Sequence, residues 1–299
     1  MTSETHRALS RNHRLTEGQA AASPSETRAP EGPTPCALTI AGSDSGGGAG
    51  IQADLKAFAR CGVHGTCAIT AITAQSTVGV SAIHPVPPEI VLAQVRAVVA
   101  DIDVGAIKVG MLGTVAITLA VAQALDELPA ETPVVVDPVM VAESGARLLE
   151  ADAQQALIEE ILPRATVLTP NLPEARALAG GDPEIDGEDL ARAVLSLSPR
   201  IVVLTGGHRE QATDLFLDSR GDGRIVEIPG ERHPDGAAHG SGCTHSSVLA
   251  AQLALGRTPL QAARSARSLA GSAVANGLRD VGTGAGPVDI LGLSARRSS

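Results

Sequence analysis

The stretch LTIAGSDSGGGAGIQADLK, residues 38–56, decides the fold. Its beginning, 37–41, is short and apolar and is typical of a buried strand, whereas 51–60 carries apolar residues at helical spacing. Between them, 43–50 is rich in glycine, which permits tight turns and a close approach of the backbone to a ligand. A strand, a glycine-rich loop and a helix in this order indicate an α/β protein with a ligand site at the loop.

Short apolar strands and amphipathic helices alternate along the rest of the chain. The pattern predicts further strands at 65–73, 78–83, 106–109, 134–136, 166–168, 201–204, 213–217 and 224–228. It predicts helices at 88–101, 114–125 with Thr114 as the N-cap, 151–161, 172–179, 187–197, 244–255 and 260–276. We therefore expect a mostly parallel central sheet with helices on both faces, and an antiparallel pair formed by 213–217 and 224–228.

Charge and composition exclude several classes of partner. The chain has 299 residues, with 23 Lys+Arg against 33 Asp+Glu and a formal net charge of −10. This acidic balance argues against binding to a nucleic-acid backbone, and 1% aromatic residues argues against base stacking. No apolar run reaches the roughly 18 residues that a membrane helix needs. We expect a small-molecule partner, and neither nucleic acid nor a membrane.

Residues 1–35 differ in composition from the remainder. They are rich in Ser, Thr, Glu, Arg, Ala and Pro without apolar periodicity, so we expect a disordered tail there and one domain over 36–299. Four cysteines in a chain of this length do not form a disulfide framework, which favours a cytoplasmic protein. The sequence leaves the oligomeric state open, with a homodimer as one option.

Five polar clusters follow predicted strands or precede a late helix. They lie at 42–45, at Asp137, at 169–171, at 205–208 and at 239–243. Because ligands bind beyond the carboxyl ends of parallel strands, these clusters predict one site. Two familiar nucleotide motifs do not fit it. The segment 48–53 has the glycine spacing of a dinucleotide loop but lacks the acidic residue about 20 positions later, and neither Lys56 nor Lys108 follows a glycine as in a P-loop.

The segment 240–243 precedes the helix predicted at 244–255. Small residues there leave the first helical amides accessible, which predicts an anion pocket. Cys243 at the helix N-terminus is expected to have a lowered thiol pKa. Two other interpretations stay open: Cys243 is a packing residue at an ordinary helix start, or it binds a metal together with His239 and His245.

Six blocks of sequence resemble one family, the hydroxymethylpyrimidine/phosphomethylpyrimidine kinases of thiamine biosynthesis, which belong to the ribokinase-like superfamily. The blocks are 38–56, 73–77, 108–112, 136–140, 169–175 and 239–244. The resemblance implies a three-layer sandwich and ATP-dependent phosphorylation of 4-amino-5-hydroxymethyl-2-methylpyrimidine and then of its monophosphate. The alternatives are a pyridoxal or pyridoxine kinase of the same fold, and a ligand-binding protein without activity.

The same resemblance implies roles for individual residues. The pyrimidine pocket is formed by Gln75, Gly42, Asp54, Met111 and Val139. The anion hole for the transferred phosphoryl group is formed by Gly240, Ser241, Gly242 and Cys243, with Cys243 at the place of the catalytic base. Mg²⁺ is held by Asp137 and Glu174, with help from Asn171, and ATP is contacted by Asn171, Thr205 and Gly207.

Two of these implied roles are affected by other features of the sequence. Thr205 stands where the family often has Lys, which leaves Arg209 or Mg²⁺ to supply the charge toward ATP. Asn171 also has the position of a helix N-cap, so its side chain is explained by capping as well as by ligand binding.

Overall fold

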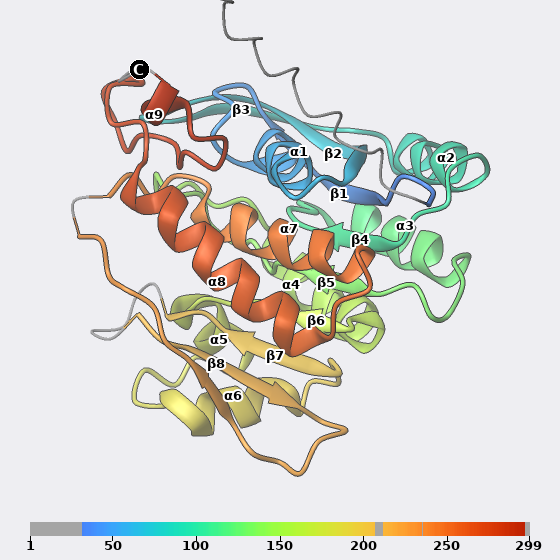
Figure 1. Cartoon of the computed structure of the whole chain (residues 1–299). Coiled ribbons are helices and arrows are strands. Elements are labelled where there is room, and N and C mark those ends of the chain that lie inside the picture. Colours follow the sequence, from blue (N-terminus) through green and yellow to red (C-terminus); the bar gives the residue numbers. More distant parts are fainter. Residues whose placement is uncertain (1–31, 207–211, 235, 297–299) are drawn as a thin grey trace, which may run out of the picture. The chain divides into compact units, whose positions relative to one another are not determined.

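The computed structural model describes residues 32–206, 212–234 and 236–296. The proposed tail, 1–35, and Gly207 with Arg209 therefore fall wholly or largely outside the described residues. From residue 34 onward the described chain is organised around one nine-stranded sheet with the order β3-β2-β1-β4-β5-β6-β7-β8-β9 (Figure 1). Six neighbouring strands, β2-β1-β4-β5-β6-β7, pair in parallel, and β3, β8 and β9 are antiparallel to their neighbours.

The elements follow the predicted order along the chain. The strands are β1 (Cys36–Asp44), β2 (His64–Ser76), β3 (Gly79–Pro85), β4 (Ala106–Val109), β5 (Val134–Val136), β6 (Val167–Leu168), β7 (Ile201–Leu204), β8 (Asp214–Asp218) and β9 (Val226–Ile228). The helices are α1 (Gly50–Arg60), α2 (Pro88–Val99), α3 (Val115–Asp126), α4 (Ala151–Ala156) with its continuations η1 (Leu157–Ile161) and η2 (Leu162–Arg164), α5 (Leu172–Leu178), α6 (Gly187–Leu195), α7 (Ser241–Ala254), α8 (Pro259–Ala275) and α9 (Leu293–Arg296).

Helices cover both faces of the sheet, which confirms the three-layer sandwich. Alternate residues of β1 show the division: Leu38 and Ile40 join the core beneath the helices from α2 to α6, whereas Ala37 joins Phe58 in the core beneath α1, α7 and α8. In Figure 1, α1, α7 and α8 lie on the near side of the strands. The central strands are apolar on both faces because both faces are buried.

The carboxyl ends of two strands extend further than predicted. β1 continues through Gly42 and Ser43 to Asp44, and its pairing with β2 shifts between Ala41 and Ser43. β2 continues to Ser76, so Gln75 lies in a strand rather than in a turn. A polar sequence at a strand end is typical of a loop. The extension is seen only in the backbone pairing of β1 with β2 and of β2 with β3.

Local capping fixes where several helices begin. The Thr114 hydroxyl accepts a hydrogen bond from the amide of Ile117, which confirms its predicted N-cap role. Asn171 caps α5 in a reciprocal capping box with Glu174. α7 begins at Ser241, earlier than predicted, and Gly240 precedes it with φ of 81°, a left-handed conformation that favours glycine.

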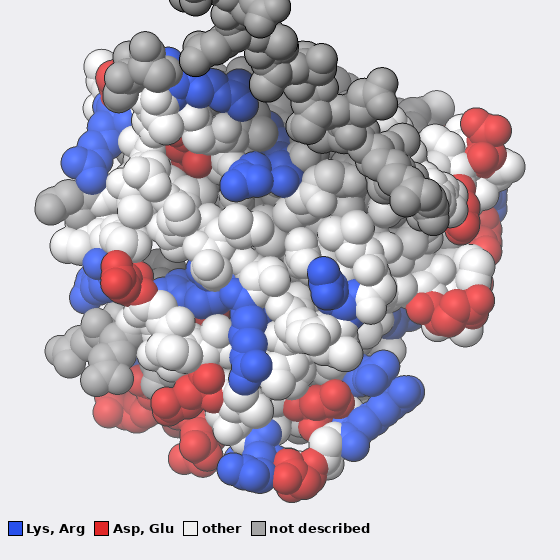
Figure 2. Space-filling model, viewed as in Figure 1, with Lys and Arg blue, Asp and Glu red and all other residues white. Residues whose placement is uncertain are grey.

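Acidic and basic side chains are interspersed on the face drawn in Figure 2, with uncharged areas between them. Every helix in the described ranges is too short or too polar to span a lipid bilayer.

Candidate active site

A cavity of about 410 Å³ lies at the carboxyl ends of the parallel strands. The residues predicted for the site that line it are Gly42, Gln75, Met111, Asp137, Val139, Asn171, Glu174, Thr205, Gly240, Ser241, Gly242 and Cys243. Asp54 is the exception among the described ones, because it is fully buried and does not line the cavity. The strand-end rule therefore brings the predicted polar clusters together in one place.

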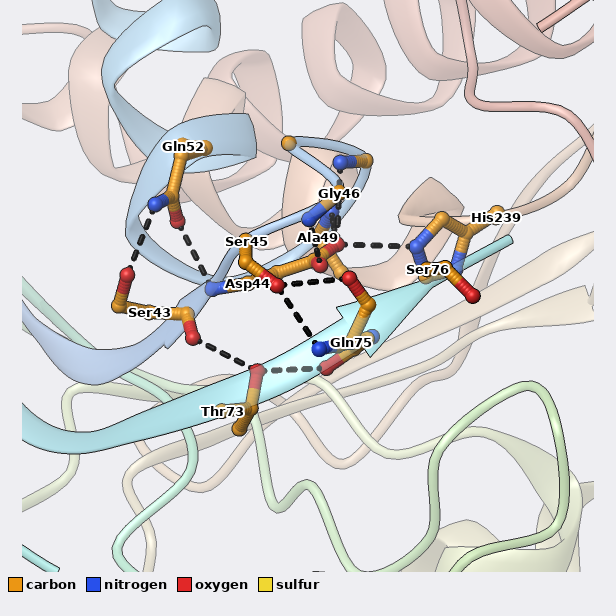
Figure 3. A network of polar contacts seen from close by, with 12 residues as sticks. Ser43, Asp44, Ser45, Gly46, Ala49, Gln52, Thr73, Gln75, Ser76 and His239 are labelled. Carbon is orange, nitrogen blue, oxygen red and sulfur yellow. Dashed lines mark hydrogen bonds and ion pairs between the residues drawn. The ribbon is translucent and has the colours of Figure 1, made fainter. Parts of the chain in front are cut away.

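One end of the cavity is built around Asp44 at the end of β1 (Figure 3). Its carboxylate accepts hydrogen bonds from the amides of Gly46, Gly48 and Ala49 at 2.8, 3.0 and 2.8 Å, and lies 3.0 Å from Nε2 of His239. Burial opposes the charge, but His239 and these amides outweigh it and lower the pKa of Asp44. Asp44 thus ties the glycine-rich loop after β1 to the loop before α7.

Glycine is required where these two loops meet. A Cβ added at Gly48 would overlap the His239 ring, and one added at Gly240 would overlap the carbonyl oxygen of Gly48. The φ of 81° at Gly240 adds a second reason for glycine there. The loops pack directly on one another, so the start of α7 is fixed by the loop that follows β1.

Gln75 is held beside this network. Its backbone amide donates to the Ser45 hydroxyl at 2.8 Å, and that hydroxyl donates to the Gln75 carbonyl at 2.7 Å. The Thr73 hydroxyl lies 3.0 Å from the Gln75 side-chain amide and donates to the Ser43 carbonyl at 2.8 Å (Figure 3). On the facing side, a Cβ at Gly42 would approach Sδ of Met111 to 2.9 Å, so Met111 packs tightly against that backbone.

The N-terminus of α7 forms the middle of the cavity. The Ser241 amide donates to the Ala238 carbonyl and the Thr244 amide to the Gly240 carbonyl, both at 2.9 Å. The intervening amides of Gly242 and Cys243 belong to the first turn, where a helix supplies no carbonyl partner. This geometry suits an anion, as predicted for the segment.

The expected lowering of the Cys243 pKa is wrong. Cys243 is partly exposed as a residue, but burial of its thiol raises the pKa to about 12, and the Asp137 and Asp54 carboxylates add to the increase. Lys108 and the Gly50 amide act in the opposite direction without compensating. Burial of the thiol and the two carboxylates therefore outweigh the positive charge of Lys108.

A buried cluster of charges lies beneath the cavity. Lys108 Nζ lies 3.0 and 3.1 Å from the carboxylate oxygens of Asp54 and 3.7 Å from Oδ2 of Asp137. Asp54 also accepts hydrogen bonds from the hydroxyls of Thr39, at 2.6 Å, and Ser247, at 2.7 Å. These three partners consume the Asp54 carboxylate, so the predicted contact of Asp54 with a pyrimidine does not agree with its position.

Sequence reasoning did not give Lys108 a place in this cluster. Its signal is the occurrence of a lysine in the apolar run at 106–109. Burial opposes its charge, but Asp54, Cys243 and Asp137 raise the pKa of Lys108 above its ordinary value. A cation in such a strand needs a buried anion, which indicates an ion pair.

Two carboxylates, of Asp137 and Glu174, face the middle of the cavity. Burial and the nearby Asp137 raise the pKa of Glu174 to about 8. Burial also raises the pKa of Asp137, against the effect of Lys108, and the Ser246 hydroxyl donates to its Oδ2 at 3.1 Å. Two acidic groups that repel one another form a donor set that suits a divalent cation with oxygen ligands.

The predicted alternative of a His–Cys metal site is wrong. Among the residues that the structure describes, no group of three or more His, Cys, Asp or Glu side chains could hold a metal ion. His239 instead pairs with Asp44, and Nε2 of His245 lies 3.0 Å from Oδ2 of Asp214.

The other end of the cavity contains Thr205, Asp214, His245 and Arg267. The Thr205 hydroxyl donates to the Pro170 carbonyl at 3.3 Å. Two side chains that line this end have a buried nitrogen without a hydrogen-bond partner, namely His245 Nδ1 and Arg267 Nε. The hydrogen bonds of this end are therefore less complete than those around Asp44.

Comparison with known proteins identifies relatives of this chain. The chain matches the phosphomethylpyrimidine kinase family model over residues 44–289. It is 47% identical over 263 residues to the hydroxymethylpyrimidine/phosphomethylpyrimidine kinase of Rhizobium meliloti, covering 85% of this chain and 96% of that protein.

Solved structures show the same fold. Phosphomethylpyrimidine kinase from Clostridium difficile is 37% identical with a TM-score of 0.67, over 78% of this chain and 96% of that one. Pyridoxal kinase from Staphylococcus aureus, in complex with AMP-PCP and pyridoxal, is 33% identical with a TM-score of 0.76, over 87% and 94%. The fold and the site together define a small-molecule kinase of the ribokinase-like class. Within it, the chain belongs to the phosphomethylpyrimidine kinase family.

Proposed function

We propose that this protein transfers the γ-phosphoryl group of ATP to 4-amino-5-hydroxymethyl-2-methylpyrimidine and then to the monophosphate. One observation carries the proposal: a single cavity holds Gln75 and Met111 at one end, Asp137 and Glu174 in the middle and the N-terminus of α7 between them. Such a cavity can hold an alcohol and a polyphosphate side by side. The family of the chain agrees with this chemistry.

The pyrimidine is proposed to bind between Gln75, Gly42, Met111 and Val139. The side-chain amide of Gln75 offers both a donor and an acceptor to the edge of the ring. The Thr73 hydroxyl holds this side-chain amide and the Ser45 hydroxyl holds the Gln75 backbone before the substrate arrives, which reduces the entropy lost on binding.

The anion hole at 240–243 is proposed to hold the phosphoryl group during transfer. The substrate oxygen forms a bond to the γ-phosphorus as the bond to the β-phosphate oxygen breaks, and ADP leaves. The amides of Gly242 and Cys243 stabilise the charge on the transferred group. Alignment and charge stabilisation provide most of the rate in such reactions.

The thiolate form of Cys243 is proposed to accept the substrate proton late in the transfer, which gives the neutral thiol. Because its pKa is about 12, the thiol is almost entirely protonated at neutral pH. Its share of the rate is therefore expected to be small compared with that of the amides and the bound cation.

Asp137 and Glu174 are proposed to hold Mg²⁺, with Asn171 close to the same position. When bound, the ion supplies positive charge to the phosphate oxygens of ATP. Asn171, Thr205 and Gly207 are the proposed nucleotide contacts, although the Asn171 side chain also accepts the Glu174 amide at 2.9 Å as an N-cap. A cytoplasmic location, and a homodimer as one option for assembly, belong to the same proposal.

A coupled assay of ADP release tests the function. We expect ADP with the hydroxymethylpyrimidine and with its monophosphate in the presence of Mg-ATP. Pyridoxal is the second candidate substrate, because the structure resembles a pyridoxal kinase with a TM-score of 0.76. Preference for pyridoxal in direct competition would favour that activity, and no ADP with any of the three would leave a ligand-binding protein.

A further inference from the structure

Arg267 projects from α8 into the cavity at the end that contains Thr205. Its side chain is 12% exposed. A Cβ added at Gly230 would overlap Nε and Cζ of Arg267, so the guanidinium lies directly against the backbone of that glycine. Packing therefore restricts the Arg267 side chain to one place, whereas a free surface arginine would sample many rotamers.

The hydrogen bonds of this guanidinium are incomplete. Nη2 donates to the Glu231 carbonyl at 3.3 Å, and Nη1 lies 3.9 Å from Oδ1 of Asp214. Nε is buried and has no partner. A guanidinium has five N–H groups, and among the described residues Nη1 and Nη2 make only the two contacts given above, so both nitrogens can still donate to an acceptor in the cavity.

Asp214 does not fully neutralise Arg267 because it has other partners. Its Oδ1 accepts the Gly206 amide at 2.8 Å, and its Oδ2 lies 3.0 Å from Nε2 of His245. Asp214 is thereby shared between the end of β7, helix α7 and Arg267. His245 lies one helical turn after Ser241, so this shared carboxylate also links Arg267 to the start of α7.

The other basic side chains of the cavity are less suited to a ligand. Lys108 is fully buried and held by Asp54. Arg232 lines the cavity but is exposed. Thr205, at the same end as Arg267, brings no charge. In the described part of the cavity lining, Arg267 is thus the cation that packing holds in place and that still has N–H groups for a ligand.

We propose that Arg267 binds the polyphosphate of the nucleotide, at phosphates other than the one transferred in the anion hole. This inference rests on the proposed function, because it requires a nucleoside triphosphate in the cavity. A planar guanidinium pairs well with phosphate oxygens, and the positive charge offsets part of the polyphosphate charge. Arg267 acts on nucleotide affinity and has no contact with the pyrimidine.

The test compares Arg267→Ala and Arg267→Lys with Arg264→Ala, which removes an exposed arginine one turn earlier on α8. Calorimetry measures the Kd values of ATP, ADP and adenosine, and kinetics measures KM for both substrates. We expect Arg267→Ala to weaken ATP and ADP about 10- to 100-fold and adenosine less than about 2-fold. The KM of the pyrimidine stays unchanged, Arg267→Lys is intermediate, and Arg264→Ala matches the wild type.

Two results overturn the inference while leaving the proposed function intact. The first is that the wild type binds ATP and Arg267→Ala binds it equally well. The second is an equal loss of affinity for ATP and adenosine, which indicates a structural role. If the wild type binds no ATP, the proposed function fails and this inference with it. Should Arg267→Ala unfold early, Arg267→Gln keeps the packing on Gly230 without the charge and is judged by the same ratio of ATP to adenosine.

Discussion

The two ends of the cavity differ in how far their polar groups are satisfied. Around Asp44, a carboxylate is surrounded by three backbone amides and His239. Around Arg267, buried polar atoms of Arg267 and His245 have no partner. The proposed pyrimidine end is thus organised before any ligand binds, whereas the proposed nucleotide end is completed by its ligand.

This difference has a physical consequence for specificity. A prearranged end discriminates between ligands of similar shape because a wrong ligand leaves its fixed groups unpaired. An end with available donors gains affinity from any ligand that supplies acceptors. We therefore expect substitutions at the Asp44 end to change stability and substrate choice together, and substitutions at the Arg267 end to change nucleotide affinity alone.

The largest expected effect is that of Asp44→Ala. It removes the acceptor of four hydrogen bonds, several of them charge-assisted, so we expect the free energy of unfolding to fall by at least about 3 kcal/mol. Turnover of the remaining folded protein should fall more than about 100-fold because the start of α7 loses its support. Urea unfolding and turnover in matched conditions measure both.

Asp289→Ala is the matched control for that substitution. Asp289 accepts hydrogen bonds from the amides of Leu293 and Ser294 and from the Ser294 hydroxyl, yet it does not line the cavity. It should lose stability without losing turnover per folded molecule. Equal turnover losses in the two variants would contradict a role of Asp44 in arranging the site.

Gln75→Ala is expected to have the next largest effect. Loss of one hydrogen-bonded contact to the ring costs about 1–3 kcal/mol, which corresponds to a rise of roughly 5- to 150-fold in the KM of the pyrimidine. The KM of ATP should not change, because Gln75 lies at the opposite end of the cavity from Arg267. Equal increases in both KM values would count against a substrate role, and Ser76→Ala, which alters the exposed neighbour in β2, serves as the control.

The sequence predicts the strands, and the place where the site residues gather, well. The strands at 106–109 and 134–136 match the structure residue for residue, because short segments dominated by apolar residues are typical of strands buried on both faces. The carboxyl-end rule gathers Asp137, Asn171 and Gly240 without any knowledge of their contacts. Backbone topology is thus encoded locally, by patterns that a single segment displays.

Side-chain environment is not encoded in this way. Asp54 in α1 is paired with Lys108 in β4, and this pairing depends on how α1 packs on the neighbouring strand β1. The pKa of Cys243 depends on carboxylates from α1 and from the end of β5. Arg267 lies in a regular amphipathic helix, and its position is set by contacts with the distant backbone of Gly230 and Glu231. These features depend on residues far apart in the chain, which periodicity does not relate.

A smaller effect is expected for Cys243. Since burial raises its pKa to about 12, iodoacetamide should label it slowly at pH 7, and no faster than Cys61 or Cys67. Cys243→Ala should lower turnover by no more than about 10-fold, because the amides of the first turn of α7 remain. Mass-spectrometric labelling rates and turnover are the measurements. Rapid labelling with a loss above about 1000-fold would restore a thiolate base to the mechanism.

The smallest effect is a pH dependence of stability that originates in Glu174. Its pKa is about 8 in the folded protein and close to 4.3 in an unfolded chain, so the folded state holds the extra proton between those values. The contribution of this group to stability is therefore present at pH 4.3 and below and is lost as the pH rises through 8. A neutral side chain of the same shape would not show this loss.

Glu174→Gln isolates this contribution, because it removes the charge and the titration while a carbonyl oxygen remains for the amide of Asn171 in the capping box. We expect its melting temperature to exceed that of the wild type by an amount that grows by a few degrees from pH 5 to pH 8, since a neutral amide carries no buried charge and is not repelled by Asp137. Calorimetry of both proteins without nucleotide or divalent cation measures the difference. The same variant should turn over more slowly, because a neutral amide binds Mg²⁺ more weakly than a carboxylate. A difference in melting temperature that is constant with pH would mean that neither burial nor Asp137 raises the pKa of Glu174 in the folded protein, and the case for a divalent cation shared by the two carboxylates would lose its electrostatic basis.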